Sequence, residues 1–156
     1  VNLIGNHEQM MLAALDPRAE ADVVTFWLDN GGAPTLESYG ADPADPETWD
    51  AVPDDDIRLL RALRPSFALG GYFFAHAGVR PDVPLESQDV MDLAWIREPF
   101  LSWRGRLPAV VVHGHTPSQQ GPEVLPHRIG IDTGAVFGGP LTCAVLEGRK
   151  LGFLYA

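Results

Sequence analysis

The sequence predicts a mixed α/β fold in which helices come first and strands follow. In the first part of the chain, apolar residues recur at the spacing of amphipathic helices. The second part contains short apolar or alternating runs separated by glycine and proline, a pattern typical of strands. The 156 residues are 46% hydrophobic and 21% charged, which is ordinary for a globular protein. This order of elements favours an α+β arrangement over regular alternation.

Helices account for most of the structure predicted in the first part of the chain. Residues 1–4 resemble the end of a strand, and Gly5 permits a sharp turn into a helix over residues 8–15. A second helix is predicted over residues 19–30. Asn30-Gly31-Gly32 is a typical helix stop, so the second helix should end there.

Three further helices complete the helical prediction. A short helix over residues 35–39 is followed by an acidic, proline-rich surface loop over residues 40–53. Asp54-Asp55-Asp56 then begin a helix, because the helix dipole favours negative charge on the first turn. Ser87 is predicted to cap another helix that runs to Trp95.

The strands are predicted from short apolar runs. They cover residues 67–69, 72–76, 109–113, 128–133, 141–146 and 151–155. Residues 147–150 have the length and composition of a hairpin connection between the last two strands.

Charge and cysteine content limit the function. The formal net charge of −10 repels polyanions, so we expect no nucleic-acid partner. Cys143 is the one cysteine, which excludes an intrachain disulfide and favours a reducing, cytoplasmic compartment. No apolar run long enough for a membrane span and no secretory leader occurs, so we expect no membrane partner. Because the chain opens at Val1 with what resembles the end of a strand, we expect it to be N-terminally incomplete.

Polar residues gather at four places where a predicted strand meets a glycine turn. Open sheets bind ligands at such strand ends. A single histidine there is more often structural, but several imidazoles with one carboxamide suit Mn²⁺, Fe²⁺ or Zn²⁺. Four of the five histidines, all except His127, lie in these corners, which are Gly5-Asn6-His7-Glu8, His76-Ala77-Gly78, His113-Gly114-His115-Thr116 and Asp132-Thr133-Gly134.

The corners resemble, in order, the motifs of bacterial PPP-type serine/threonine phosphatases, within the calcineurin-like metallophosphoesterase superfamily. Residues 5–8 match GNHE, residues 76–78 match H-[AG]-G, residues 113–117 match HGHTP and residues 131–135 match IDTGA. Residues 27–32 and 95–98 also resemble the bacterial branch. The resemblance implies a two-sheet β-sandwich flanked by helices, with the site at the strand ends.

The resemblance also implies roles for five residues. Asn6, His76 and His115 would bind one metal of a dinuclear divalent site, with Mn²⁺ expected and Fe²⁺ or Zn²⁺ as alternatives. A hydroxide that bridges the two metals would attack phosphorus directly. His7 would be the general acid that protonates the leaving alkoxide. Arg97 would bind phosphate oxygens, because its planar fork matches them.

Other interpretations of the same residues stay open. Asn6 could cap the following helix, and Arg97 could pair with a neighbouring acid. His113 would support the ligands from behind or be structural, while Glu8 and Asp132 would orient ligands or cap backbone groups.

The family's GDxHG and GDxxDRG segments do not occur in this chain. Residues 1–156 are therefore expected to be the C-terminal two-thirds of a single metallophosphoesterase domain. The expected function is metal-dependent hydrolysis of phosphomonoesters, with phosphoserine and phosphothreonine in proteins as substrates. The alternatives are symmetrical cleavage of dinucleoside polyphosphates at the same site, or a non-catalytic binding module if the upstream motifs are truly missing.

Overall fold

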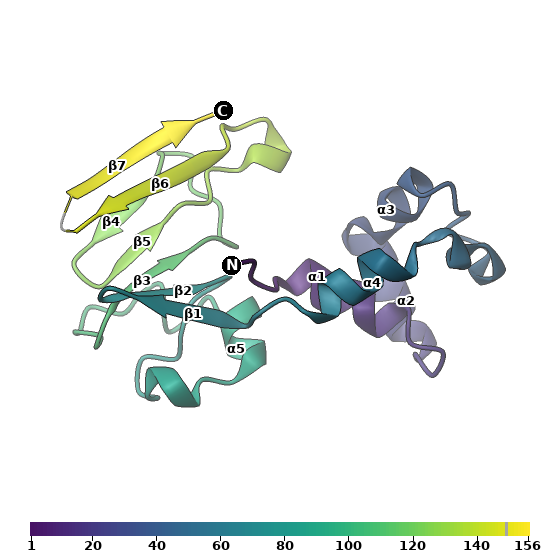
Figure 1. The fold of residues 1–156 in the computed structure, drawn as a ribbon, viewed down its shortest axis with the longest axis horizontal. Helices are drawn as coiled ribbons and strands as arrows, with labels where there is room; N and C mark the ends of the chain where they lie inside the picture. Colours follow the sequence, from purple (N-terminus) through teal and green to yellow (C-terminus); the bar gives the residue numbers. More distant parts are fainter. Residues whose placement is uncertain (149) are drawn as a thin grey trace. The chain divides into compact units, whose positions relative to one another are not determined.

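The computed structural model describes residues 1–148 and 150–156, which divide into two compact units. One unit, Asn2–Leu63, is helical; the other comprises Val1 with Arg64–Ala156 and contains both sheets (Figure 1). Helices and two sheets together confirm the predicted α/β class. That residues 1–156 form a single domain stays a prediction. Among the described residues, no helix is long and apolar enough to cross a membrane.

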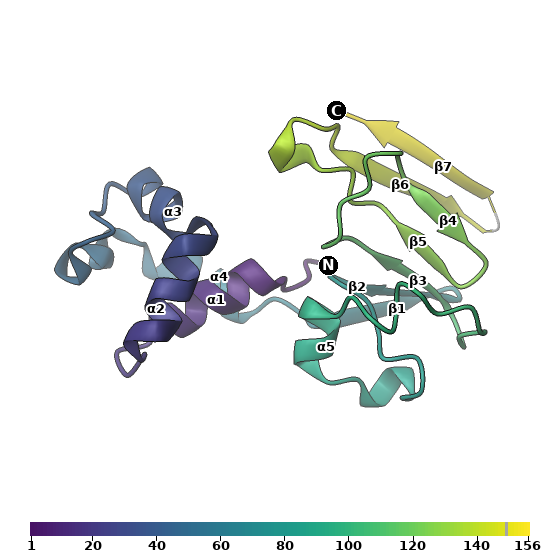
Figure 2. The same ribbon diagram turned by 180° about the vertical axis from the view of Figure 1, so that it is seen from behind.

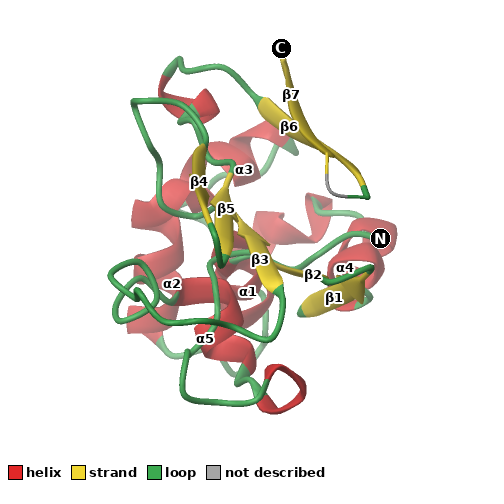
Figure 3. Cartoon of the chain, turned by 90° about the vertical axis from the view of Figure 1, so that its left-hand side faces the viewer, coloured by secondary structure: helices red, strands yellow, loops and turns green. Residues whose placement is uncertain are grey.

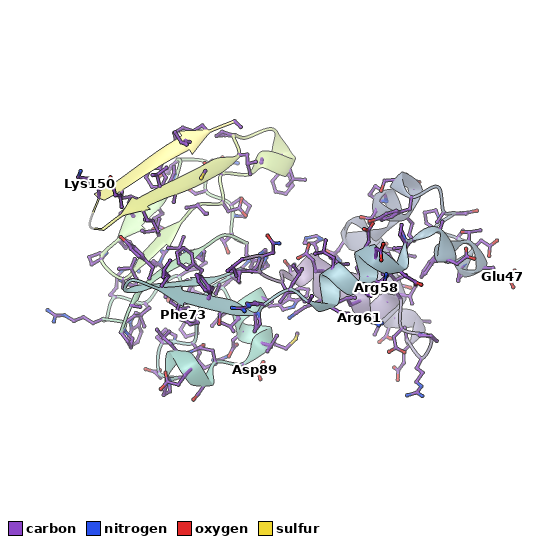
Figure 4. The ribbon with its side chains drawn as sticks, viewed as in Figure 1. Glu47, Arg58, Arg61, Phe73, Asp89 and Lys150 are labelled. Atoms are coloured by element: carbon purple, nitrogen blue, oxygen red, sulfur yellow. The ribbon has the colours of Figure 1, made fainter. Side chains whose placement is uncertain are left out.

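The helical unit follows the predicted order of helices. It contains α1 (Asn6–Ala14), α2 (Ala21–Trp27), α3 (Ala33–Ser38) and α4 (Asp54–Arg61). The predicted helix stop is confirmed, because Gly31 takes a left-handed φ of 97° inside the wide turn Leu28–Gly32. On α4, shown with side chains in Figure 4, three aspartates occupy the first turn and Arg58 and Arg61 the last, as the helix dipole favours.

The predicted loop over residues 40–53 is more ordered than its composition indicates. It contains a 3₁₀ helix, Pro46–Ala51, whose Trp49 is buried. The Trp49 ring meets the Trp27 ring edge-on, with 5.9 Å between centroids, and its indole N–H donates to the Asp42 carbonyl at 3.0 Å. An aromatic pair of this kind stabilises by about 0.5–1.5 kcal/mol beyond its buried area. The contacts of Trp49 therefore fix the middle of the segment over residues 40–53.

The other unit contains a five-stranded mixed sheet and a two-stranded sheet (Figures 1 and 2). The strands of the larger sheet lie in the order β1 (Ser66–Leu69), β2 (Tyr72–Ala75), β3 (Val110–His113), β5 (Arg128–Gly130) and β4 (Glu123–Leu125). The pairs β2–β3 and β3–β5 are parallel, whereas β1–β2 and β4–β5 are antiparallel. Parallel neighbours end at the same edge of the sheet, which brings the loops after them together.

The smaller sheet is an antiparallel pair, β6 (Thr142–Glu147) and β7 (Lys150–Tyr155), seen side by side in Figure 3. Glu147 pairs with Lys150, which confirms the predicted hairpin. Arg149 of its connection lies outside the described residues.

A hydrophobic core joins the large sheet to α5 (Val90–Trp95). Phe73 of β2, labelled in Figure 4, packs in this core with Val111 of β3 and Leu93 of α5. Phe100, beyond the helix, is fully buried in the same core. Burying a side chain of this kind stabilises the fold by about 1.5–3 kcal/mol. The core therefore fixes the sheet against the segment between β2 and β3.

Two predicted boundaries in this unit are wrong. Asp89, not Ser87, caps α5: its carboxylate accepts a hydrogen bond from the Met91 backbone N–H at 2.7 Å. Ser87 lies in a preceding 3₁₀ turn. The strand predicted over residues 128–133 ends at Gly130, and β4 is an element that the sequence prediction lacks.

Candidate functional site

Two of the predicted metal ligands, His76 and His115, lie together at one edge of the large sheet. His76 directly follows β2 and His115 follows β3, its parallel neighbour. Their ring centroids are 5.2 Å apart, with 59° between the ring planes. The Gly114 backbone N–H donates to the His76 carbonyl at 2.8 Å, so the two loops are joined directly. The structure therefore places two half-buried imidazoles side by side where ligands bind in such sheets.

His115 has an unusual backbone conformation. Its φ is 65°, and it is the one residue other than glycine with positive φ among residues 1–148 and 150–156. For an L-residue the left-handed region costs roughly 1–2 kcal/mol. Strained positions of this kind cluster at functional sites, where the surroundings hold them. The conformation of His115 is thus an independent indication that this loop is functional.

Asn6 and His7, the other predicted metal ligand and the general acid, belong to the helical unit. Gly5 is the N-cap of α1, so the alternative in which Asn6 caps the helix is wrong. Asn6 is buried and His7 is exposed on the first turn of α1. Glu8 caps the helix by accepting a hydrogen bond from the Gly5 backbone N–H at 2.7 Å. That Asn6 joins His76 and His115 at one metal stays a prediction.

Arg97, the predicted phosphate ligand, is exposed just beyond α5. Its carbonyl accepts from the Leu101 backbone N–H at 2.9 Å, which closes a turn. Glu98, its neighbouring acid, accepts from the Ser102 backbone N–H at 3.2 Å. The guanidinium of Arg97 is therefore at the surface, and its role toward phosphate stays a prediction.

His113 does not join the pair formed by His76 and His115. It is buried, and its ring meets the Phe100 ring edge-on, with 5.0 Å between centroids. The pKa of His113 is lowered to about 4, chiefly by burial, and the nearby charge of Arg128 contributes to this lowering. His113 is therefore a neutral imidazole behind the loop that carries His115. Asp132 likewise has a backbone role, since it accepts from the Gly134 N–H at 3.0 Å.

Arg128 is a residue of the site region that the sequence prediction lacks. Only 3% of its side chain is exposed, and it forms an ion pair with Glu123 at 2.6 Å. Its guanidinium also lies 3.3 Å from Nε2 of His113. The available signal was an arginine at the first position of a predicted strand, where a charge that becomes buried requires partners.

The donor set fits a divalent metal in part. His76 and His115 can supply two imidazole nitrogens, a type of ligand that Mn²⁺, Fe²⁺ and Zn²⁺ accept. Among the described residues, no group of three or more His, Cys, Asp or Glu side chains lies close enough to hold a metal ion. The third predicted donor, Asn6, has a carboxamide side chain and is therefore not one of these four residue types.

Comparison with known proteins supports the predicted family resemblance. No model of a known protein family matches the chain. Over 148 residues the chain is 34% identical to serine/threonine-protein phosphatase 1 of Salmonella typhimurium. The aligned region covers 92% of the chain and 64% of that phosphatase. This likeness supports the predicted resemblance to the calcineurin-like metallophosphoesterases. The chain spans less than two-thirds of the length of this relative.

A solved structure has the same metallophosphoesterase fold. It is described as that of a candidate diadenosine tetraphosphatase. The superposition has a TM-score of 0.66 and covers 98% of the present chain and 67% of the candidate diadenosine tetraphosphatase chain. At 24% identity, this likeness shows the fold alone. It confirms the predicted fold class of a metallophosphoesterase with two sheets and flanking helices.

Proposed function

We propose that this chain is a metallophosphoesterase that hydrolyses phosphomonoesters with the help of two divalent metal ions. The observation that carries the proposal is the pair formed by His76 and His115 at adjacent strand ends. Their ring centroids are 5.2 Å apart, and His115 has a strained backbone conformation. The relative named a serine/threonine-protein phosphatase supports phosphoserine and phosphothreonine in proteins as the substrate class.

Three residues would hold one of the metals, namely Asn6, His76 and His115. When bound, the metals neutralise charge on the phosphate and promote deprotonation of the attacking water. Two neutral imidazoles and a carboxamide leave the positive charge of the metal uncompensated, which favours an anionic substrate. Mn²⁺ is the proposed ion, with Fe²⁺ or Zn²⁺ as alternatives.

His7 and Arg97 would act on the substrate directly. As the bond from phosphorus to the alcohol oxygen breaks, the His7 imidazolium gives its proton to that oxygen, which accelerates the reaction about 10²–10⁴-fold. The Arg97 guanidinium would bind two phosphate oxygens through parallel N–H bonds. Both side chains are exposed, so each is accessible to a phosphoester.

The experiment measures phosphate release from a phosphoserine peptide with Mn²⁺, with and without a chelator. We expect the chelator to abolish activity and His7→Asn to reduce it at least 100-fold. Glu37→Gln, at an exposed position of α3, is the control and should keep full activity. Activity that resists both the chelator and His7→Asn would refute the proposal.

A second candidate substrate follows from the fold. The solved structure described as a candidate diadenosine tetraphosphatase favours dinucleoside polyphosphates, cleaved symmetrically. Parallel assays with a phosphopeptide and with diadenosine tetraphosphate would separate the two classes. We also propose a cytoplasmic location, and substrates that are phosphoproteins or small phosphoesters without nucleic-acid or membrane partners. If neither substrate is turned over and no metal binds, a non-catalytic binding module is the remaining interpretation.

A further inference from the structure

A buried guanidinium lies beneath the candidate site. Arg128 of β5 is 3% exposed, and a charge in such a place requires compensation. Its Nη1 is 2.6 Å from Oε2 of Glu123 and its Nη2 donates to the Leu101 carbonyl at 3.1 Å. Arg128 thus joins β4 and β5 to the segment that follows α5.

Arg128 also fixes the orientation of His113. Nδ1 of His113 lies 3.1 Å from the Gly114 carbonyl, which can only accept, so Nδ1 carries the proton. Nε2 then has a free electron pair, and it faces Nη1 of Arg128 at 3.3 Å. Both ring nitrogens are therefore used, and one of their partners is the residue directly before His115. The orientation of His113 is coupled to the backbone of the strained loop.

The buried cluster formed by Arg128, His113 and Phe100 also contacts the loop that carries His76. The Arg128 guanidinium lies over the Phe100 ring at 5.8 Å, and Phe100 is fully buried. A Cβ built on Gly78, two residues after His76, would lie 2.2 Å from this ring. Phe100 therefore packs directly against the turn after His76 while its ring also meets His113. One buried cluster contacts the loops of both histidines.

We propose that Arg128 is a positioning residue for the candidate metal site. Through His113 it holds the loop of His115, and through Phe100 it holds the turn after His76. Through the Leu101 carbonyl it also holds the turn closed by the bond from the Leu101 N–H to the Arg97 carbonyl. This inference rests on the proposed function, since it assumes that His76 and His115 bind metal. A merely structural ion pair is the alternative that the experiment must exclude.

The test compares Mn²⁺ affinity in three variants by titration calorimetry. Arg128→Lys keeps the charge, but one ammonium cannot reach Glu123, His113 and the Leu101 carbonyl in the same geometry. Arg80→Lys is the control, because Arg80 makes its bidentate ion pair with Asp92 of α5 and not with a described partner of Arg128. Phe73→Leu removes core volume without removing a polar contact of the cluster, and so controls for loss of stability.

Supporting residues around a metal typically change its affinity 10–100-fold. We therefore expect Arg128→Lys to weaken Mn²⁺ binding at least 10-fold, with Arg80→Lys and Phe73→Leu within 2-fold of the parent protein at a temperature where all are folded. The ¹⁵N spectrum of His113 gives a readout that does not depend on metal. The parent should show Nδ1 protonated, and Arg128→Lys should show a mixture of tautomers.

Two results would overturn the inference, and both differ from failure of the proposed function. If the parent binds Mn²⁺ and Arg128→Lys binds it equally well, Arg128 is structural only. If Phe73→Leu weakens binding as much as Arg128→Lys does, general stability explains the effect. If the parent itself neither binds Mn²⁺ nor releases phosphate, the proposed function fails, and the inference falls with it.

Discussion

The Gly114 backbone N–H donates to the His76 carbonyl at 2.8 Å, so the residue before one candidate ligand is bonded to the other. A rigid sheet edge holds this bond, because β2 and β3 are parallel neighbours. The positions of the two imidazoles are therefore coupled through the backbone as well as through side-chain packing. A site held in this way loses little conformational entropy when it binds a ligand.

The conformation of His115 predicts an inverted order of stability for two substitutions. His115→Gly should be more stable than His115→Ala by about 1 kcal/mol, because glycine adopts a φ of 65° without strain. In most other positions alanine is the more stable of the two. Urea denaturation of both variants without metal measures the difference. Equal stability, or a more stable alanine variant, would contradict the strain.

Gly78→Ala should destabilise the sheet unit by roughly 1–3 kcal/mol or more. The added Cβ would lie 2.2 Å from the Phe100 ring, and this ring is fully buried and cannot move away. Gly152→Ala on β7 is the control, because nothing lies within 4 Å of its Cβ. Thermal unfolding of the two variants should shift for Gly78→Ala only. A shift of the same size in both would indicate a general effect of replacing glycine.

A pH dependence is expected at the hydrogen bond between the Tyr39 hydroxyl and Asp56, which is 2.9 Å long. This hydrogen bond, with some burial, raises the pKa of Tyr39, because the carboxylate favours the protonated phenol. The folded state thus keeps a proton that the unfolded state loses near pH 10. The stabilisation is present below pH 10 and is lost as the pH rises through the folded pKa.

Tyr39→Phe tests this directly. It should lower the free energy of unfolding by about 1 kcal/mol at pH 7, the usual value of such a bond. Unfolding in urea at pH 7 and at successive values above 10 would show the gap between parent and variant closing. A gap that stays constant across this range would mean that the bond does not contribute.

Metal removal should change stability only through the histidine pair. At a Mn²⁺ concentration about 100 times the dissociation constant, binding to the folded state adds about 2.7 kcal/mol. A chelator should therefore lower the melting temperature of the parent and leave that of His76→Ala unchanged. If both proteins respond alike, the metal binds elsewhere.

The sequence predicts most of the regular elements because each depends on a local pattern. The spacing of apolar residues and the glycine turns locate α1, α4 and β3. The same turns place His76 and His115 at strand ends. β4 was not predictable in this way, since Glu123–Leu125 is a three-residue strand at the edge of the sheet with too short an alternation. Ser87 and Asp89 are both good cap residues, so the sequence pattern alone does not distinguish them, and the structure has Asp89 as the cap.

The buried part of the site region could not be predicted for a different reason. An arginine is ordinarily exposed, and Arg128 is buried because Glu123, His113 and the Leu101 carbonyl meet it from separate segments. None of these contacts follows from a local period. The positive φ of His115 likewise depends on bonds to other segments. Motifs thus predict which residues matter, and tertiary contacts decide how they are held.

The parallel pairing of β2 with β3 has a consequence for how the protein folds. Tyr72 pairs with Val110, and the whole segment with α5, Arg97 and Phe100 lies between them in the chain. Such a pair forms only after a long loop has closed, and contacts of this range are among the slowest in folding. We therefore expect the two histidines to meet late, after the core around Phe100 has formed. Until then a folding chain can offer a metal single imidazoles but no pair.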